Sequence, residues 1–177
     1  MNRAVFSDRD NVLVEDLEGY IYEIEKFKLL DGVIEGLRLL NETDYKVIII
    51  TNQSGIGCRY YTKEDYKKFT EHMLNIFRKN SIRIDEIYYC PHHPDLNCDC
   101  RKPKSGMFEQ AKIDFDIDYK MSWMIGDKTK DVEAGKNIKA KTIAVIGPEQ
   151  TREKLEKANP DYIADNLLEA VKIILGR

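Results

Sequence analysis

Short apolar runs rich in β-branched residues alternate with helix-like patterns along this chain, and no other feature limits its fold as strongly. Most of these runs are four to six residues long and are followed by polar residues, as expected for buried strands of a parallel sheet. We expect strands at residues 4–7, 46–50, 84–89, 121–125, 141–146 and 162–163. Because helical patterns separate the runs, the sequence predicts an α/β fold, a mostly parallel sheet with helices on both faces.

The clearest helix follows Thr62, a residue type that commonly caps helix N-termini. Its apolar residues recur at the spacing of one helical face, and they are Tyr66, Phe69, Met73, Ile76 and Phe77. Another helix is expected to end near Leu40, with Asp31 as its cap. Further helices are expected over residues 105–113, 130–135, 151–157 and 167–175. Together these helices connect the successive strands of the sheet.

Length and composition limit the classes of function. A chain of 177 residues with 42% hydrophobic residues is long and apolar enough for one globular domain, which we assign to residues 1–177. The formal net charge is −3, so nucleic acid is not an expected partner. The longest aliphatic runs have four residues, far fewer than the ~20 that span a bilayer, and no secretion signal is recognised at the N-terminus. We expect a cytoplasmic protein, and nothing requires it to be more than a monomer.

Three of the four cysteines lie between Cys90 and Cys100, in the pattern Cys90-x-His92-x₅-Cys98-x-Cys100. A disulfide between Cys98 and Cys100 would be badly strained, and a reducing compartment disfavours the other pairings. Three thiolates and one imidazole instead match the closed ligand set of a structural zinc ion, with no open position for a reactive water. Spacing alone does not choose between His92 and His93. The sequence therefore predicts a zinc loop at about residues 90–102.

Acidic residues follow two of the predicted strands. Asp8 and Asp10 come after the first strand, and Asp127 and Asp131 follow the fourth. Taken alone, an Asp-x-Asp pair would be interpreted as two solvated acids at a strand end. In a parallel sheet, however, the carboxyl ends of the strands share one edge, which also receives Thr51. Clustered carboxylates near a lysine and a hydroxyl suit Mg²⁺ and a phosphoryl group. The sequence thus predicts a magnesium-dependent phosphoryl site.

Five motifs in this order resemble those of the haloacid dehalogenase-type phosphatases, across about three-quarters of the chain. They are Asp8-Arg9-Asp10, Thr51-Asn52-Gln53-Ser54-Gly55, Cys90-Pro91-His92-His93-Pro94, Cys98-x-Cys100-Arg101-Lys102-Pro103 and Gly126-Asp127-Lys128. Within the family, the chain is most similar to the branch that acts on heptose 1,7-bisphosphates, whose histidinol-phosphatase relatives share most of the pattern. The resemblance implies a Rossmann-like fold, hydrolysis of a sugar phosphate at the 7-position, and His92 as the fourth zinc ligand.

The resemblance also implies roles for the catalytic residues. Asp8 would be the nucleophile that forms an aspartyl-phosphate, and Asp10 would be the general acid and then the general base. Thr51 and Lys102 would hold the transferring phosphoryl oxygens. Magnesium would be bound by the Asp8 and Asp127 carboxylates and the Asp10 carbonyl, with Asp131 orienting its neighbours. The expected substrate-binding residues are Gly19, Tyr20, Asn52, Gln53, Ser54, Arg101 and Lys128.

Two residues depart from the family pattern near the substrate. Asn11 stands where the family usually has glycine, and Val14 stands where the heptose enzymes usually have asparagine. Asn tolerates a left-handed backbone, so we expect the turn after Asp10 to survive. One extra residue also precedes Gly19. These departures lie where the family contacts substrate and leave the catalytic chemistry intact.

The spacing of the elements leaves no room for a large cap domain, so we expect an open site bordered by residues 15–28 and the zinc loop. Three alternatives remain open from the sequence. Histidinol phosphate would be another substrate of the same chemistry. A receiver-like signalling domain would accept a phosphoryl group without turnover, but it would not require a zinc loop. A 3′-phosphatase acting on nucleic acid ends is disfavoured by the acidic charge balance.

Overall fold

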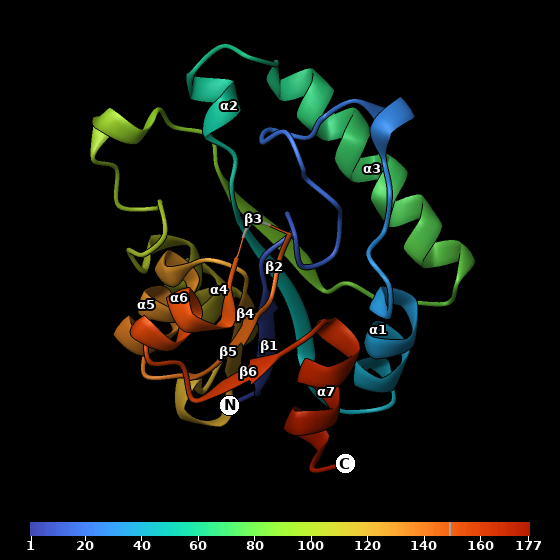
Figure 1. Ribbon diagram of the computed structural model, residues 1–177, viewed down its shortest axis with the longest axis vertical. Helices are drawn as coiled ribbons and strands as arrows, with labels where there is room; N and C mark the ends of the chain where they lie inside the picture. The colour runs from blue at the N-terminus through green and yellow to red at the C-terminus, as the bar shows by residue number, and fades with distance from the viewer. Residues whose placement is uncertain (149) are drawn as a thin grey trace.

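A computed structural model describes residues 1–148 and 150–177 and contains one sheet of six parallel strands in the order β3-β2-β1-β4-β5-β6. The strands are β1 (Ala4–Ser7), β2 (Lys46–Asn52), β3 (Glu86–Cys90), β4 (Trp123–Gly126), β5 (Lys141–Val145) and β6 (Tyr162–Ala164). The sequence placed a strand at each of these positions. Figure 1 shows the sheet at the centre of the molecule, with β1 and β4 in its middle.

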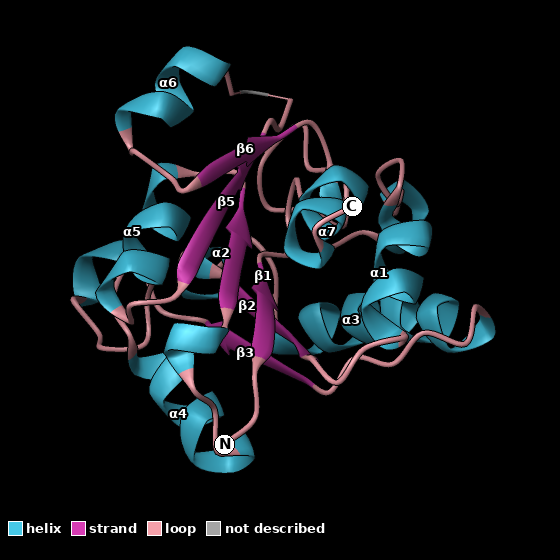
Figure 2. Cartoon of the chain, turned by 90° about the horizontal axis from the view of Figure 1, so that it is seen from below, coloured by secondary structure: helices cyan, strands magenta, loops and turns pink. Residues whose placement is uncertain are grey.

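Helices cover both faces of the sheet, which confirms the predicted α/β class (Figure 2). The helices are α1 (Val33–Asn41), α2 (Ser54–Gly57), α3 (Lys63–Lys79), α4 (Gly106–Phe115), α5 (Thr129–Asn137), α6 (Arg152–Lys157) and α7 (Leu167–Leu175). Short 3₁₀ turns are η1 (Ile24–Lys26), η2 (Pro94–Leu96) and η3 (Tyr119–Met121). One core cluster packs α1, α3 and α7 on the sheet, and a second packs α4 and α5 on the opposite face.

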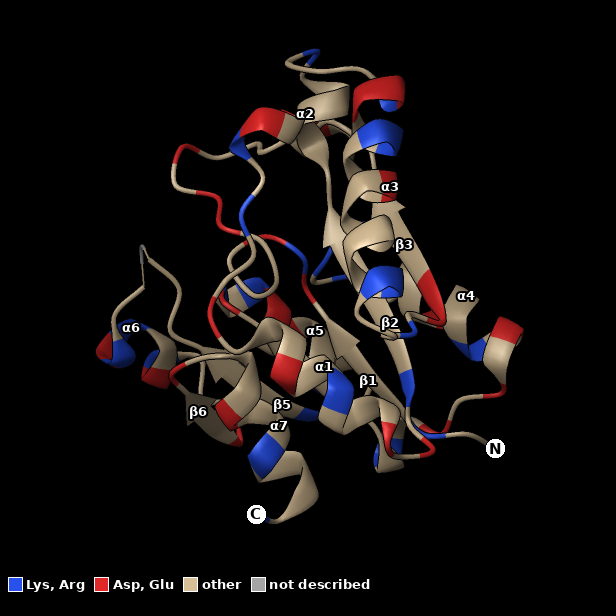
Figure 3. Cartoon of the chain, turned by 90° about the vertical axis from the view of Figure 1, so that its right-hand side faces the viewer, with Lys and Arg blue, Asp and Glu red and all other residues tan. Residues whose placement is uncertain are grey.

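Helix α3 forms as the sequence predicted. Thr62 and Asp65 make a capping box in which each side chain binds the other residue's backbone N–H. The buried side chains of this helix are Tyr66, Phe69, Met73 and Phe77. Helix α3 therefore packs its apolar face on the core, while Figure 3 shows acidic and basic residues interspersed over its exposed surface.

The start of α1 and the presence of α2 differ from the prediction. Gly32 at φ 80° is the N-cap of α1, so Asp31 is not the cap. A side chain at Gly32 would meet Leu168 Cβ at 2.9 Å, and this close contact with α7 was not visible in local sequence. The short helix α2 was missed because four residues that include two glycines carry no helical periodicity.

Four strands deliver polar residues to one edge of the sheet, as the alternation predicted. Asp8 directly follows β1, Thr51 is the second-last residue of β2, Cys90 ends β3, and Asp127 follows β4. The segment between β1 and α1 runs past this edge beside α2 and α3 (Figure 1). Among the described residues, no helix has both the length and the apolar character needed to cross a membrane.

Candidate active site

A fully buried lysine stands at the centre of the polar edge. Lys102 Nζ lies 3.0 Å from Asp8 Oδ1 and 2.8 Å from Asp131 Oδ1, and it donates a 2.6 Å hydrogen bond to the Ile50 carbonyl. Its side chain is 0% exposed. An ammonium group has three N–H donors, and each of them faces an oxygen here. The cation is therefore held in place with no freedom to reach into solvent.

Three buried carboxylates surround this position. Asp8, Asp127 and Asp131 each offer an oxygen, and these oxygens lie within 4.8 Å of one another. Asp127 Oδ1 is buried without a hydrogen-bond partner in the described part of the chain. Burial, followed by repulsion from Asp8 and Asp131, raises the pKa of Asp127 to about 8. A small cation that prefers oxygen ligands would supply the missing partner, so the donor set fits Mg²⁺.

Asp8 has a different electrostatic environment from Asp127. Burial opposes its ionisation, but the Lys102 and Lys130 cations offset this effect and hold the pKa of Asp8 below its usual value. The Arg9 backbone N–H also donates to Asp8 Oδ1 at 2.8 Å. Asp8 is thus kept as an anion beside cations, which is the state that a carboxylate nucleophile requires.

The Asp131 carboxylate lies inside this cluster, whereas the Asp10 carboxylate lies outside it. Asp131 Oδ2 accepts from the Lys128 backbone N–H at 3.0 Å, so both of its oxygens have positive partners. Asp10 Oδ1 instead accepts from Arg9 Nε at 2.7 Å, and Asp10 Oδ2 accepts from Gln53 Nε2 at 2.9 Å. The side chain of Asp10 is therefore held by Arg9 and Gln53, apart from the buried cluster.

Residues 51–54 follow the end of β2 and border the cluster. Gln53 Nε2 also donates to Thr51 Oγ1 at 2.9 Å. Asn52 donates to the Lys102 carbonyl at 3.1 Å and accepts from the Lys102 N–H at 3.0 Å. These two bonds hold the Asn52 amide against the backbone of Lys102. Ser54 is buried at the start of α2.

Two further cations lie at the rim of the site. Arg101 is half-buried, and its Nη1 atom is shielded without a hydrogen-bond partner among the described residues. Lys128 is also half-buried, and the neighbouring carboxylates, chiefly Asp127, raise its pKa although burial opposes this. Lys128 thus carries a positive charge near the carboxylate cluster, where an anionic ligand would need it.

The turn after Asp10 forms as expected for an asparagine. Asn11 adopts φ 59°, and its side chain accepts from the Asp16 N–H at 2.8 Å and donates to the Asp16 carbonyl at 3.1 Å. Val14 is fully buried in the core. The substitution at this position therefore presents no polar group to the site.

The segment after this turn lines a cavity of about 400 Å³ together with Tyr60. Of the predicted site residues, only Gly19 and Tyr20 line it, so the carboxylate cluster forms no part of its wall. Both residues have positive φ angles, 77° and 63°. The Tyr20 ring packs edge-to-face on Tyr60, with 4.8 Å between ring centroids.

The cysteine loop brings four ligand atoms together. Sγ of Cys98 lies 3.5 Å from Sγ of both Cys90 and Cys100, and His92 Nδ1 lies 3.2 Å from Cys100 Sγ and 3.6 Å from Cys90 Sγ. With Zn–S bonds of ~2.3 Å, tetrahedral thiolates lie about 3.8 Å apart, so the spacing fits one zinc ion. His93 instead accepts from the Asp95 backbone N–H, and Cys58 does not belong to this four-residue group. His92 is thus the histidine of the cluster, as the resemblance implied.

Several residues of the site had no role assigned from the sequence. Arg9 is 1% exposed and is held between Asp10, Gln53 and the Ile21 carbonyl. Tyr61 donates to Gln53 at 2.5 Å, and Lys130 lies near enough to Asp8 to influence its charge. The local sequence gives no signal that a charged residue within a polar motif is buried. The burial of Arg9 is seen only in the tertiary structure, where Phe69 of α3 packs over it.

Comparisons with known proteins agree with this geometry. Residues 99–170 match the family described as HAD-hydrolase-like. A D-glycero-beta-D-manno-heptose-1,7-bisphosphate 7-phosphatase of Haemophilus influenzae is 38% identical over 98% of this chain and 97% of its own length. A D-glycero-alpha-D-manno-heptose-1,7-bisphosphate 7-phosphatase of Campylobacter jejuni is 43% identical over 84% of each chain.

A solved structure shares the fold closely. The D,D-heptose 1,7-bisphosphate phosphatase of B. bronchiseptica, crystallised with magnesium and phosphate, superposes with a TM-score of 0.90 over 99% of both chains at 23% identity. The likeness in fold thus extends over nearly the whole chain.

Proposed function

This chain belongs to the haloacid dehalogenase-like hydrolases, among the heptose-1,7-bisphosphate 7-phosphatases, and we propose that it removes the 7-phosphate of a D-glycero-D-manno-heptose 1,7-bisphosphate. The observation that carries the proposal is the buried group of Asp8, Asp127, Asp131 and Lys102. It combines an ionised nucleophile with a donor set for a divalent cation, and phosphate-monoester hydrolysis requires both.

Asp8 attacks the phosphorus atom, and the bond from phosphorus to the sugar oxygen breaks to leave an aspartyl-phosphate on Asp8. Asp10 gives its proton to the departing sugar oxygen. In the second half of the reaction Asp10 takes a proton from water, and the oxygen of that water displaces phosphate from Asp8. The separation of the Asp10 carboxylate from the cluster supports this division of work.

The remaining residues neutralise and position the phosphoryl group. The Thr51 hydroxyl holds one of its oxygens, and Lys102, fixed 3.0 Å from Asp8, supplies positive charge beside the attacking carboxylate. Asp8, Asp127 and the Asp10 carbonyl would hold Mg²⁺, which when bound supplies positive charge to the phosphoryl oxygens. Asp131 orients Lys102 through their 2.8 Å contact.

Substrate recognition is assigned to the rim of the site. Arg101 and Lys128 meet the second phosphate or the sugar hydroxyls. Ser54 contributes from α2, and Gly19 and Tyr20 contribute from the cavity that they line. An open rim with fixed cations suits a polar substrate that carries two phosphates.

We assign a structural zinc ion to Cys90, His92, Cys98 and Cys100. Its folding energy would order a loop that has little apolar core of its own, and Arg101 and Lys102 follow directly after the last ligand. Thiols that must remain reduced to bind metal support a cytoplasmic location. We further propose that residues 1–177 form one domain that acts as a monomer.

A phosphate-release screen tests the function. The substrates are the α and β anomers of the heptose bisphosphate, histidinol phosphate and simple hexose phosphates, each with and without Mg²⁺. We expect kcat/KM for a heptose bisphosphate to exceed the others by roughly tenfold or more, and the product to keep its 1-phosphate. Preference for histidinol phosphate would overturn the substrate assignment, and product lacking the 1-phosphate would overturn the assigned position of cleavage.

A further inference from the structure

The carboxamide of Gln53 joins the two halves of the catalytic machinery. Its Nε2 atom donates to Asp10 Oδ2 and to Thr51 Oγ1, both at 2.9 Å. Its Oε1 atom accepts from Arg9 Nη2 at 3.1 Å and from the Tyr61 hydroxyl at 2.5 Å. A carboxamide has two N–H donors and two acceptor positions, and all four are occupied here. Gln53 therefore has no hydrogen-bonding group left for a substrate.

The orientation of this carboxamide is determined by its neighbours. Arg9 can only donate hydrogen bonds, and the Asp10 carboxylate can only accept them. If the amide were turned over, Oε1 would face the Asp10 carboxylate and the NH₂ group would face the guanidinium. Both contacts would be repulsive in a site where Gln53 is 2% and Arg9 is 1% exposed. Burial also raises the pKa of Tyr61 well above its usual value, so its hydroxyl remains a donor.

This polarity has a consequence for Thr51. Because Thr51 Oγ1 accepts from Gln53, its own hydroxyl proton is not needed for that bond. The proton is free to donate to an oxygen of the transferring phosphoryl group. The same amide fixes one oxygen of Asp10, while Arg9 Nε fixes the other at 2.7 Å.

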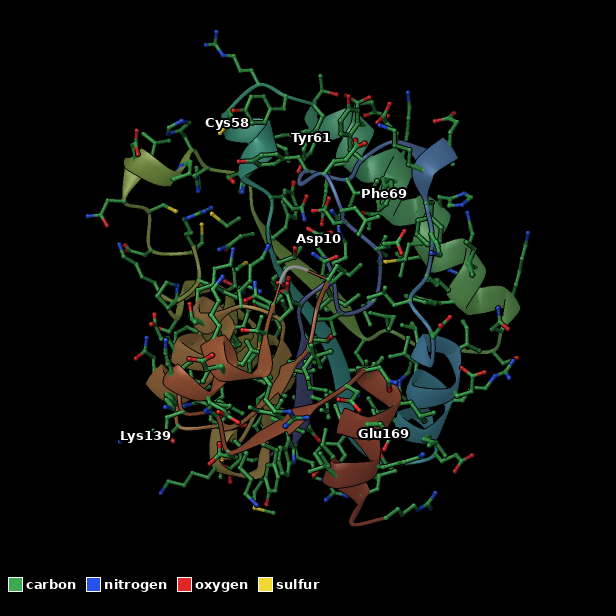
Figure 4. All side chains as sticks on the ribbon, viewed as in Figure 1. Asp10, Cys58, Tyr61, Phe69, Lys139 and Glu169 are labelled. Atoms are coloured by element: carbon green, nitrogen blue, oxygen red, sulfur yellow. The ribbon has the colours of Figure 1, made fainter. Side chains whose placement is uncertain are left out.

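The network also reaches the segment that borders the site. Arg9 Nη2 donates to the Ile21 carbonyl at 3.1 Å, and the Tyr22 ring stacks on Tyr61 with 4.8 Å between centroids. Gly55 lies beneath Tyr61, where an added Cβ would be 2.1 Å from the ring. Figure 4 shows Tyr61 near the top of the molecule and Asp10 below it, toward the centre. The position of the Ile21–Tyr22 backbone is thus linked to the two donors that hold Gln53.

We propose that Gln53 is a positioning residue whose carboxamide, held in one orientation by Tyr61 and Arg9, aligns Asp10 for proton transfer and directs the Thr51 hydroxyl toward the phosphoryl group. The role rests on the proposed function, since it takes Asp10 as the acid that protonates the leaving group. It differs from direct substrate binding because the amide acts only through two other residues.

The test compares two leaving groups in Tyr61→Phe, which keeps the ring and its stacking on Tyr22 but removes the hydroxyl. A sugar alkoxide needs protonation by Asp10, whereas nitrophenolate leaves p-nitrophenyl phosphate without it. We expect kcat/KM for the heptose bisphosphate, which loses the alignment of both Asp10 and Thr51, to fall roughly tenfold to thirtyfold. For p-nitrophenyl phosphate, which loses only the alignment of Thr51, kcat/KM should fall less than about threefold. A merely structural role of Tyr61 would lower both by the same factor.

The control is Tyr88→Phe, which removes a hydroxyl that donates to Asp114 at 2.6 Å on α4, away from the site. The ratio of kcat/KM for the heptose bisphosphate to kcat/KM for p-nitrophenyl phosphate should not change in this variant. Gln53→Glu keeps the size of the side chain but places an oxygen against Asp10, so its ratio should fall at least as far as that of Tyr61→Phe. Melting curves identify any variant that does not fold. If only one of Tyr61→Phe and Gln53→Glu folds, that variant is enough to test the proposal.

Three outcomes separate the proposals. A selective loss with the sugar substrate supports the positioning role. Parallel losses with both substrates, or no loss, overturn the positioning role and leave the proposed function standing. A wild-type enzyme that releases phosphate from neither substrate overturns the proposed function and, with it, the role of Gln53.

Discussion

The chain has two groups of metal-ligating side chains, and they are built in opposite ways. The Cys90–Cys100 group takes its ligands from the end of β3 and the loop that follows it, and it is buried only at Cys90. The Asp8, Asp127 and Asp131 group is fully buried and joins the ends of strands that are far apart in sequence. The first group depends on local spacing and the second on the whole sheet.

Because of this difference, we expect the loss of each group of ligands to have a different effect on the protein. The loop has few apolar contacts of its own, so a metal ion there adds folding energy. The carboxylate cluster stores like-charge repulsion in the core, which costs stability until a cation binds. Loss of the first site should therefore act on the fold, and loss of the second should act on the reaction.

The largest effect is expected for Asp8→Asn. An amide is not a nucleophile here, so phosphate release should fall at least about 10³-fold, with no phosphoenzyme trapped by rapid acid quench. The melting temperature should stay near that of wild type, because Lys102 keeps its contact with Asp131. Asp114→Asn, an exposed position on α4, should retain full activity. Turnover in Asp8→Asn would exclude Asp8 as the nucleophile.

Cys98→Ser should act mainly on the fold. We expect the zinc content to fall from about one equivalent to well below it, and the melting temperature to fall by roughly 10 °C. Added Mg²⁺ should not restore the loss. Cys58→Ser is the matched control because Cys58 is the cysteine outside the cluster, and it should keep both zinc and stability. Equal zinc in the two variants would contradict the assigned ligand set.

The smallest effect concerns Asp127 in enzyme freed of magnesium by dialysis, with zinc retained. Its carboxyl has a pKa of about 8 in the folded protein against an ordinary value of 3.8, so between these pH values the native state keeps a proton that the unfolded chain has released. The stability of the magnesium-free protein should therefore decline as pH rises through this window.

Asp127→Asn should remove part of that decline. At pH 8.5 its melting temperature should exceed that of wild type by about 4 °C, and the gain should be smaller at pH 5. Added Mg²⁺ should stabilise wild type and not the variant. A gain of the same size at both pH values would mean that the charge of Asp127 is not the cause.

Local pattern was sufficient for most of the architecture. Strand β1 and helix α7 have the predicted bounds, and Thr62 caps α3 as expected. These elements have strong periodicity or a capping residue, and their neighbours reinforce that preference. Helix α1 shows the opposite case, since the close approach of Gly32 to Leu168 on α7 decides where it begins.

The site residues divide in the same way. The resemblance and the residue types singled out Asp8, Asp127, Lys102 and the cysteine loop, and the fold brings each of these groups together. The full occupation of the Gln53 amide and the burial of Arg9 could not be anticipated. The first depends on Tyr61 reaching Gln53 after β2, and the second on Phe69 of α3 packing over Arg9 after β1.

By itself the sequence determined the order of strands and helices and the spacing of the thiols, because hydrophobic periodicity and ligand spacing act over a few neighbouring residues. Only the tertiary structure decided which acid faces the cations and which faces Gln53, and that Lys102 is enclosed between Asp8 and Asp131. Burial and charge environment depend on distant segments that meet at one edge of the sheet, and no local pattern encodes them.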